Sequence, residues 1–572
     1  MRLLTLAATG LAALALSACG EKPKVAEAPP PAAPAGPVGA KLTTSPEITA
    51  ADLAARDKEL ADDKYEGRGP GTVAGEAAAQ WIADEMKRAG VEPGNPDGTY
   101  FQTVEMVAQT VNPDTSSLKI AGKDKSWDLK LGPDAVYISK KQDQPTVSFA
   151  DSDMVFVGYG VVAPEEKWND YAGLDVKGKT VVMFVNDPGF ITNDKSLFKG
   201  QAMTYYGRWT YKFEEAARQH ATAALIIHET KPAAYGWNVV QDSWTGEQAD
   251  LVRPDAGADR AQLEGWIQYD KAKEMFAAAG LDIDKMRAAA NKRGFKPVPM
   301  TGLKATATIN QTIEKRTSRN VIGTVKGSTK PDEHFLLMAH WDHLGKNSTA
   351  KPGEDAIYNG AVDNATGVSA ILDMAEKAAS GPKPQRSMTF LAVTLEESGL
   401  LGSAYFGAHP LIPLNKIVGG INIDALQPAG PSKDVVVIGY GASQLEDTLG
   451  AVLKEKGRVM GPDPEPQAGY FYRSDHVELA KKGVPMLYID SGVDLVTGGK
   501  EAGMKLGEDY RTNAYHSPKD EFHDDWDFSG MAEDINVDYE VASRIANSDA
   551  WPEWYKGNEF KAIREASLKG AQ

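Results

Sequence analysis

Cysteine is nearly absent from this sequence, since Cys19 is the only one among 572 residues. One cysteine can form no internal disulfide, and it cannot supply a cysteine-type zinc site. Positive charge is also scarce: 62 Lys and Arg face 79 Asp and Glu, a net charge of −17. Binding to nucleic-acid phosphates needs basic patches, so we predict no nucleic-acid partner. Divalent cations are not excluded, because they bind where carboxylates gather.

Two common catalytic signatures are missing as well. "HETKP" at His228 lacks the second histidine of H-E-x-x-H, which excludes the one-metal zincin class. No G-x-S-x-G elbow occurs, and the contiguous "SDH" of Ser474 to His476 cannot supply a nucleophile, base and orienting acid from separate segments. The stretch "GLDVKGKT" matches a phosphate-binding loop, but a strand pattern follows it where a helix is required. Serine catalysis and nucleotide binding are therefore not expected.

The N-terminal apolar stretch is too short for a comfortable membrane span. "MRLLTLAATGLAALALSACG" has a basic residue at Arg2 and an apolar part that ends at Leu16. We predict a signal peptide over residues 1–19, and "LSAC" resembles a bacterial lipobox, which implies cleavage before Cys19 and lipidation of its thiol. The alternative is a buried cysteine in an ordinary signal. The lipobox predicts an exported protein whose only membrane contact is this anchor, in the outer membrane facing the periplasm or the cell surface.

The rest of the chain is long enough for two or more units with sizeable cores. Residues 20–46 are rich in Pro and Ala and predict an extended tether. Residues 47–133 begin with a helical pattern that ends at Gly90 and form the first part of the main domain. Residues 134–300 contain short β-rich runs such as "MVFVGYGVV" and predict an inserted domain. Residues 301–572 alternate apolar strands with helices, which predicts an α/β fold with a mixed, largely parallel sheet flanked by helices.

Acids and histidines follow the predicted strands of this last part. They are His340, Asp342 and His343 after "FLLMA", Glu396 and Glu397 after "MTFLAVT", Asp424 after "IVGGINI", and Asp363 before an amphipathic helix. Open α/β sheets build their sites at such strand ends. Without a cation these carboxylates would repel one another, so we expect a multivalent metal ion. Histidine and carboxylate ligands without cysteine suit zinc in an open catalytic site, with manganese or cobalt as substitutes.

The adjacent pair Glu396 and Glu397 predicts two separate roles. Neighbouring side chains on an extended chain point in opposite directions. One carboxylate can therefore reach a metal ion while the other faces a substrate.

Six segments, in this order, resemble the co-catalytic dizinc aminopeptidases and their relatives, the glutamate carboxypeptidases. They are "AHWDHLG", "GAVDNATGVSAILDMAE", "TLEESGLLGS", "GGINIDA", "YRSDHVELAKKGVPMLYID" and "AYHSPKDE". The resemblance extends over roughly residues 53–550. "VFVGYGVVAPEEKWNDYAGLDVKGKTVVMFVNDPG" is similar to the β-rich protease-associated domain that some members insert before the metal-binding part. The implied fold is that of the zinc peptidases, phosphorylase/hydrolase-like.

The resemblance implies two zinc ions per chain and a set of ligands. His340 and Asp424 would bind one zinc ion, Glu397 and His516 the other, and Asp363 would bridge both. Asp342 would orient His340 as an acid behind the ligand shell. Glu396 would be the general base that takes a proton from a hydroxide-forming water between the metals, and Tyr515 would stabilise the oxyanion. His343 would shape the pocket rather than bind metal. The bond Asp363–Asn364 would be a non-proline cis peptide.

Peptides are the expected substrates, but the residues leave the cleaved end open. A carboxypeptidase needs Arg or Lys for the C-terminal carboxylate, whereas an aminopeptidase needs acids for the α-amine. The excess of acids favours an aminopeptidase over a glutamate-type carboxypeptidase. The alternative from another class is a binding lipoprotein without activity, and relatives of that kind have lost metal ligands that this chain keeps.

Overall fold

The computed structural model describes residues 36–347 and 350–570. The predicted signal peptide, the lipidation site Cys19 and residues 20–35 of the predicted tether lie outside the described residues. Within the described part, no helix combines the length and the apolar character that a membrane crossing requires.

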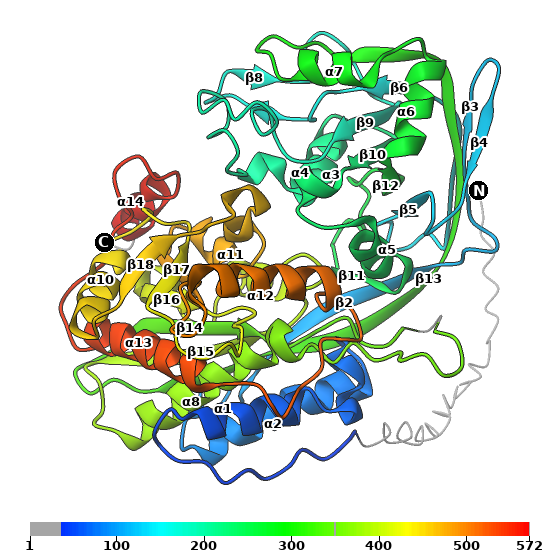
Figure 1. The fold of residues 1–572 in the computed structure, drawn as a ribbon. Coiled ribbons are helices and arrows are strands. Elements are labelled where there is room, and N and C mark those ends of the chain that lie inside the picture. The colour runs from blue at the N-terminus through cyan, green and yellow to red at the C-terminus, as the bar shows by residue number, and fades with distance from the viewer. Residues whose placement is uncertain (1–35, 348–349, 571–572) are drawn as a thin grey trace, which may run out of the picture. The chain divides into compact units, whose positions relative to one another are not determined.

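A large mixed sheet carries the C-terminal half of the chain (Figure 1). Its strands are β1 (Glu92–Pro93), β2 (Phe101–Val111), β11 (Gln248–Leu251), β13 (Val298–Val325), β14 (Lys330–His340), β15 (Arg386–Val393), β16 (Ile417–Asn422), β17 (Asp434–Ile438), β18 (Val459–Pro462) and β19 (Met486–Asp490). The neighbours β15, β14, β16 and β19 are parallel in that order, while β13 and β17 pair antiparallel at either side of them. The predicted largely parallel α/β fold is confirmed.

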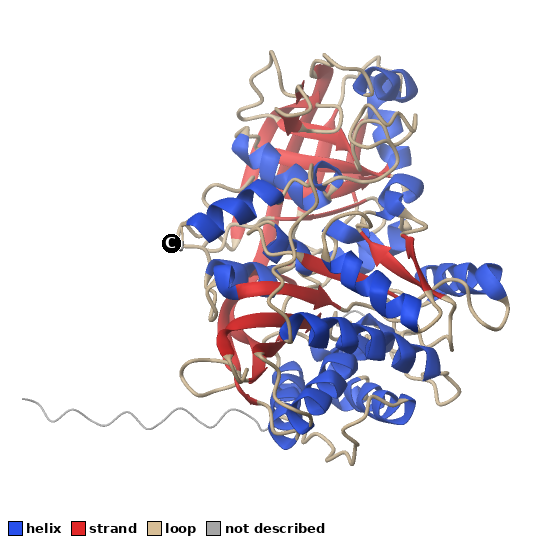
Figure 2. Ribbon diagram, turned by 90° about the vertical axis from the view of Figure 1, so that its left-hand side faces the viewer, coloured by secondary structure: helices blue, strands red, loops and turns tan. Residues whose placement is uncertain are grey.

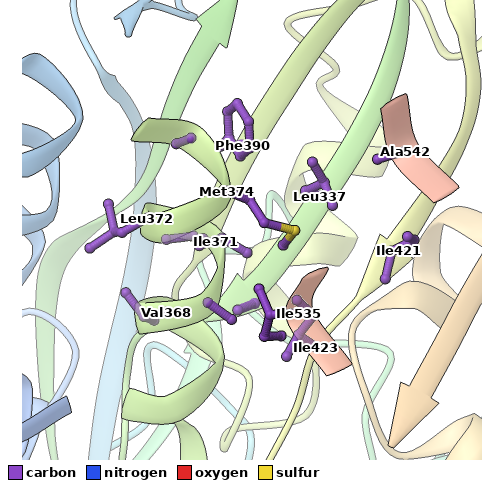
Figure 3. Close-up of a cluster of buried hydrophobic side chains, with 14 of the residues drawn as sticks. Leu337, Val368, Ile371, Leu372, Met374, Phe390, Ile421, Ile423, Ile535 and Ala542 are labelled. Atoms are coloured by element: carbon purple, nitrogen blue, oxygen red, sulfur yellow. The ribbon is translucent and has the colours of Figure 1, made fainter. Parts of the chain in front are cut away.

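Helices cover this sheet because their apolar faces match its buried strands. They are α1 (Ala50–Leu60), α2 (Val73–Arg88), α8 (Thr366–Ser380), α9 (Leu401–Ala408), α10 (Leu445–Glu455), α11 (His476–Ala480) and α13 (Ser529–Ala546). Two more helices, α12 (Gly499–Asn513) and α14 (Lys561–Lys569), bury no apolar face. Every residue of β15 is buried, which agrees with its apolar run from Phe390 to Val393. Figure 3 shows Ile371 and Met374 of α8 among strand residues Leu337 and Phe390, with Ile535 of α13 nearby.

A second sheet forms in the inserted region, the name used here for residues 134–300. Its strands are β3 (Ser117–Ala121), β4 (Ser126–Leu129), β5 (Ala135–Ile138), β6 (Thr146–Phe156), β9 (Thr180–Phe184), β10 (Ala223–His228), β12 (Leu263–Gln268) and the first part of β13. Its helices are α3 (Trp209–Arg218), α4 (Thr230–Ala233), α5 (Trp237–Thr245), α6 (Tyr269–Ala278) and α7 (Ile283–Ala290), and β7 (Val162–Ala163) and β8 (Trp168–Asn169) form a small ribbon. Figure 2 distinguishes the helices and strands of both sheets.

The second sheet extends past the predicted 134–300 range at both ends. The hairpin β3–β4 precedes this range, and β13, which is 28 residues long, continues beyond it into the large sheet. β2 pairs with β13 from Phe101↔Val321 to Val111↔Gln311, so the two strands form one long ribbon that connects the sheets. The alternating burial of β13 continues through Asn310 and Gln311 at the junction, so the strand passes from one sheet into the other.

The end of the predicted tether lies on the main domain instead of extending freely. Ala40 donates its N–H to Glu59 and accepts from the indole of Trp81, at 2.8 and 2.9 Å. Gly39 permits this approach, because a Cβ there would come within 2.0 Å of the Trp81 ring. A Pro/Ala-rich segment cannot build its own core, but it can pack on a neighbouring one.

Candidate metal centre

Strand ends bring the predicted residues together at one edge of the large sheet. His340 ends β14, Glu396 and Glu397 follow β15, and Asp424 follows β16. The register aligns these ends, since His340 pairs with Val393 and Met338 with Asn422. Parallel strands place their carboxyl ends at the same edge, so segments far apart in sequence converge there.

The remaining two residues come from turns at this edge. Asp363 lies in the irregular turn Ala361–Ala365 that precedes α8, and the Asp363–Asn364 bond is cis, as the resemblance implied. His516 lies in the loop after α12 with φ +52. Neither position follows from strand periodicity: Asp363 was singled out as an acid before an amphipathic helix, and His516 only through the family resemblance.

Three donor atoms meet at His340. Its Nε2 lies 3.2 Å from Asp363 Oδ1 and 3.3 Å from Asp424 Oδ1. The three side chains thus offer one nitrogen and two oxygens to a common point. This is the predicted ligand set of the first zinc ion.

A second set meets at His516. Its Nε2 lies 2.9 Å from Glu397 Oε2 and 3.4 Å from Asp363 Oδ2. Asp363 therefore presents one carboxylate oxygen to each histidine, which is the arrangement expected of a bridging ligand.

The charges of this cluster are not balanced by basic side chains. Within residues 36–347 and 350–570, the ion-pair partners of Asp363, Glu396, Glu397 and Asp424 are histidines, and neither Lys nor Arg is among them. His340 is 1% exposed and Asp363 5%. Buried carboxylates are costly without a counter-charge. The donor types, their convergence and this uncompensated charge all fit a pair of divalent cations.

The pKa values of His516 and Glu397 are shifted in the directions that favour the charged form of each side chain. Burial alone would lower the pKa of His516, yet the carboxylates of Glu397 and Asp363 outweigh it and raise that pKa to about 10. Burial alone would raise the pKa of Glu397, but the charges of His516 and His343 outweigh it and hold that pKa at about 2. The cluster therefore attracts cations strongly.

Glu396 and Glu397 do have different surroundings. Glu397 accepts at 2.6 Å from His343 Nδ1 and faces His516, whereas Glu396 Oε2 is 4.0 Å from His340 Nε2 and lines the hollows beside the cluster. Burial, with Glu397 and Asp424 nearby, raises the pKa of Glu396 well above its usual value. A carboxyl group that faces an open space and binds protons readily is suited to a general base.

The expected role of Asp342 needs a correction. His340 Nδ1 donates to the backbone carbonyl of Asp342 at 3.1 Å, while the Asp342 carboxylate is 4.0 Å away. That carboxylate instead accepts the N–H of Glu396 at 3.1 Å. The turn after β14 folds back and places the carbonyl closest to the ring, so Asp342 supports both His340 and Glu396 through different atoms.

Two further residues support the cluster, and of these the sequence interpretation did not single out Asp520. Asp520 accepts the N–H groups of Val362 and Asp363 at 2.9 and 3.1 Å and so fixes the turn that carries the bridging residue. Ser474, from the "SDH" segment, donates to Asp424. The signal for Asp520 was its position four residues after His516 in "HSPKD".

Two hollows border the cluster, and Glu396, Arg473, Tyr235 and Tyr515 line both. The first also contains the acids Asp463, Glu465 and Asp490. The second contains Lys140, Arg208, Ser243, Trp244 and His516, most of them from the inserted region. Tyr515 stacks on His516 with ring centres 4.0 Å apart, and its OH lies 3.4 Å from Arg473. This places the predicted oxyanion tyrosine at the wall of the site.

Part of the chain is similar to a known protein family. Residues 320–539 match the sequence profile described as Peptidase family M28. A probable zinc metalloprotease of the fungus Pyrenophora teres f. teres is 39% identical over 83 residues, 14% of this chain and 17% of that protein. A glutamate carboxypeptidase 2 homolog of Caenorhabditis elegans is 24% identical over 308 residues, 49% of this chain and 38% of its own length.

A similar fold occurs in a solved structure, the aminopeptidase from Aneurinibacillus sp. strain AM-1. The two share 17% identity with a TM-score of 0.50, over 88% of this chain and 96% of the other. The five predicted ligands lie within the matched profile, from His340 to His516. Residues 320–539 are therefore similar to peptidase family M28, and the resemblance to dizinc aminopeptidases and glutamate carboxypeptidases is confirmed.

Proposed function

We propose that this protein is a zinc-dependent metallopeptidase that removes residues from one end of a peptide. The observation that carries the proposal is the sharing of Asp363 between two histidine–carboxylate sets, with Glu396 beside them. His340, Asp363 and Asp424 would hold one zinc ion, and His516, Asp363 and Glu397 the other. Bound there, the two ions would lower the pKa of a water molecule and polarise the scissile carbonyl.

The chain's own residues supply the proton transfers and the positioning. Glu396 would accept a proton from the attacking water and later deliver it to the departing amine. Its backbone N–H is held by Asp342, which keeps the carboxyl group directed at the hollows. The Tyr515 hydroxyl would donate a hydrogen bond to the developing oxyanion, and its neighbour Arg473 strengthens that donor.

An aminopeptidase is the first candidate. The first hollow carries Asp463 and Asp490, which have no ion pair with Lys or Arg among the described residues and can receive a substrate's α-amine. Glu465 is less available, because Arg511 pairs with it at 2.7 Å. The name of the Aneurinibacillus protein agrees with this choice.

A carboxypeptidase is the second candidate, favoured by Arg208. This side chain is 9% exposed, its Nε is buried without a hydrogen-bond partner, and no carboxylate pairs with it in the described part of the chain. Burial, and secondarily Arg473, lowers its pKa to about 10, so it stays charged at neutral pH. A buried cation without a partner beside Glu396 is suited to a substrate carboxylate.

One set of peptides separates the two candidates. The purified protein, supplied with zinc, would be given a free peptide, its N-acetylated form and its C-amidated form, with Glu396→Gln as the inactive control. Loss of cleavage on N-acetylation alone establishes the aminopeptidase, and loss on C-amidation alone establishes the carboxypeptidase. If the protein binds no zinc and cuts none of the three, the metallopeptidase proposal fails.

Arg208 provides a sharper test of the second candidate. For a carboxypeptidase, Arg208→Ala should raise KM on the order of 100-fold, because a charged contact to the substrate is lost. The matched control is Arg218→Ala at the end of α3, the helix for which Arg208 is the N-cap residue. The Arg218 guanidinium pairs with Glu215 at 2.8 Å and does not line either hollow. An unchanged KM in Arg208→Ala would leave the aminopeptidase as the sole candidate.

A further inference from the structure

Helix α5 of the inserted region reaches the candidate metal centre. The hydroxyl Oγ of Ser243 lies 3.2 Å from Nδ1 of His516. Ser243 stands on residues 237–245, and the histidine is 273 positions later in the chain. The contact therefore joins two parts of the fold that are distant in sequence.

The two ring nitrogens of His516 have separate partners. Nε2 faces Glu397 and Asp363, which leaves Nδ1 to face Ser243. A histidine that binds metal through Nε2 carries its proton on Nδ1, and that N–H needs an acceptor that fixes the ring. For His340 the acceptor is the Asp342 carbonyl, two residues away on the same turn. For His516 it is a hydroxyl from another region.

Ser243 is held by the inserted region itself. Val239 and Val240 of α5 are buried, and the Trp244 ring packs edge-on against Trp209 with centres 5.5 Å apart. The Ser243 carbonyl accepts from the Gln248 amide at 2.6 Å. The position of the hydroxyl thus depends on how α5 packs within the inserted region.

His516 has less support from its own segment. The preceding helix α12 buries none of its side chains. The backbone of His516 has φ +52, a conformation that residues with a β-carbon adopt with some strain. Among the described residues, the His516 imidazole contacts the proposed zinc ligands Asp363 and Glu397. Its other partners are the rings of Tyr515 and His343 and the hydroxyl of Ser243.

We propose that Ser243 is a positioning residue for His516, so that docking of α5 is coupled to occupation of the zinc site formed by His516, Glu397 and Asp363. The proposal rests on the proposed zinc-dependent function. Coupling is reciprocal: a hydroxyl that orients the ligand strengthens zinc binding, and bound zinc holds α5 in place. The inserted region is then a working part of the metal centre and not only a wall beside it.

Zinc binding itself provides the test. Metal-free protein would be titrated with zinc against a chromophoric chelator, and both affinities measured for the wild type, Ser243→Ala and Ser243→Thr. Partners of this kind contribute 10–100-fold to metal affinity, so we expect Ser243→Ala to weaken one of the two sites about 10-fold and leave the other unchanged. Ser243→Thr keeps a hydroxyl and should restore the affinity.

The matched control is Thr245→Ala on the same helix, because its hydroxyl donates only to the carbonyl of Gln241. It should bind zinc like the wild type. Hydrogen exchange gives an independent measure: zinc should slow amide exchange in residues 237–245 of the wild type and do so less in Ser243→Ala.

The outcomes separate the inference from the function on which it rests. If the wild type binds two zinc ions and cleaves peptides while Ser243→Ala shows equal affinities and equal protection of α5, the coupling is refuted and the function stands. If the wild type binds no zinc, both fail.

Discussion

The inserted region and the large sheet each bury a cluster of ionisable side chains, and the two clusters differ in how their charges are met. In the inserted region, Lys212 donates to two backbone carbonyls, at 2.6 and 3.1 Å. Asp170 accepts two backbone N–H groups and the Trp168 indole, and Asp187 accepts the N–H and the hydroxyl of Thr204. Both carboxyl groups also attract the Lys212 ammonium group.

The cluster at the edge of the large sheet has the opposite construction. Its carboxylates face histidines and one another, receive no Lys or Arg ion pair within the described residues, and border open hollows. The comparison teaches that a buried charge alone does not identify a functional site. What identifies it is a charge that the chain leaves uncompensated where a ligand can enter.

Replacement of the proposed base should give the largest effect. We expect Glu396→Gln to lower kcat on the order of 10³-fold, because general-base catalysis contributes 10²–10⁴-fold. Zinc content should stay at that of the wild type, since Glu396 is not among the proposed ligands. His516→Ala is the contrast and should lose zinc. Metal analysis and turnover of both variants are the measurements, and loss of zinc from Glu396→Gln would contradict the division of roles between Glu396 and Glu397.

Removal of zinc should lower the stability of the wild type and leave that of a variant with disturbed zinc ligands nearly unchanged. At a free zinc concentration of 1,000 times Kd, binding stabilises the fold by about 4 kcal/mol. Chelation should therefore lower the thermal midpoint of the wild type. Asp363→Asn, which disturbs both ligand sets, should show little difference between zinc and chelator. An equal shift in the variant would mean that zinc acts elsewhere.

Loss of the cation in the inserted region should affect stability without affecting zinc. Lys212→Met leaves Asp170 and Asp187 buried without their counter-charge, and breaking such a group costs about 3 kcal/mol. The thermal midpoint should fall while zinc content remains at the wild-type value. Lys177→Met, at an exposed position of the same region, is the control and should change neither. A loss of zinc in Lys212→Met would show that the two clusters are not independent.

Asp170 should make the stability of the folded protein depend on pH between about 4 and about 7. Burial raises the pKa of its carboxyl from 3.8 to about 7, so between these pH values the folded state holds a proton that the unfolded state has released. The contribution of Asp170 to stability therefore falls as pH rises from about 4 to about 7, by up to ~1.4 kcal/mol per pH unit. Unfolding midpoints of the wild type and Asp170→Asn across this range should diverge, with the wild type losing stability. Asp143→Asn, at an exposed position, should run parallel to the wild type.

The local pattern was sufficient for much of the fold and the candidate site. Strand residues such as Phe335 and Phe390 are apolar because both faces of their strands are covered, so the strands could be read directly from the sequence. Parallel strands share an edge, so acids that follow those strands had to meet. Glu396 and Glu397 do face different partners, but they lie in the turn after β15, where Leu395 has φ +59, so the expected two-residue repeat of an extended chain does not set their directions.

The order of the chain alone could not determine which atoms meet. At Asp342 the backbone carbonyl contacts His340 in place of the expected carboxylate, because the turn after β14 folds back. The boundaries of the inserted region stay a prediction, although its sheet continues through β13 into the large sheet.

By itself the sequence predicted the α/β architecture and the convergence of His340 and the strand-end acids, because these depend on local periodicity and on the chemistry of side chains. The zinc ligands and the separate roles of Glu396 and Glu397 stay predictions. Only the tertiary structure decided that Ser243 meets His516 and that Arg208 lines the same hollow as Glu396 with its Nε unpaired among the described residues. Those contacts join residues nearly 200 or more positions apart. They depend on the packing of the inserted region against the large sheet, which no local pattern records.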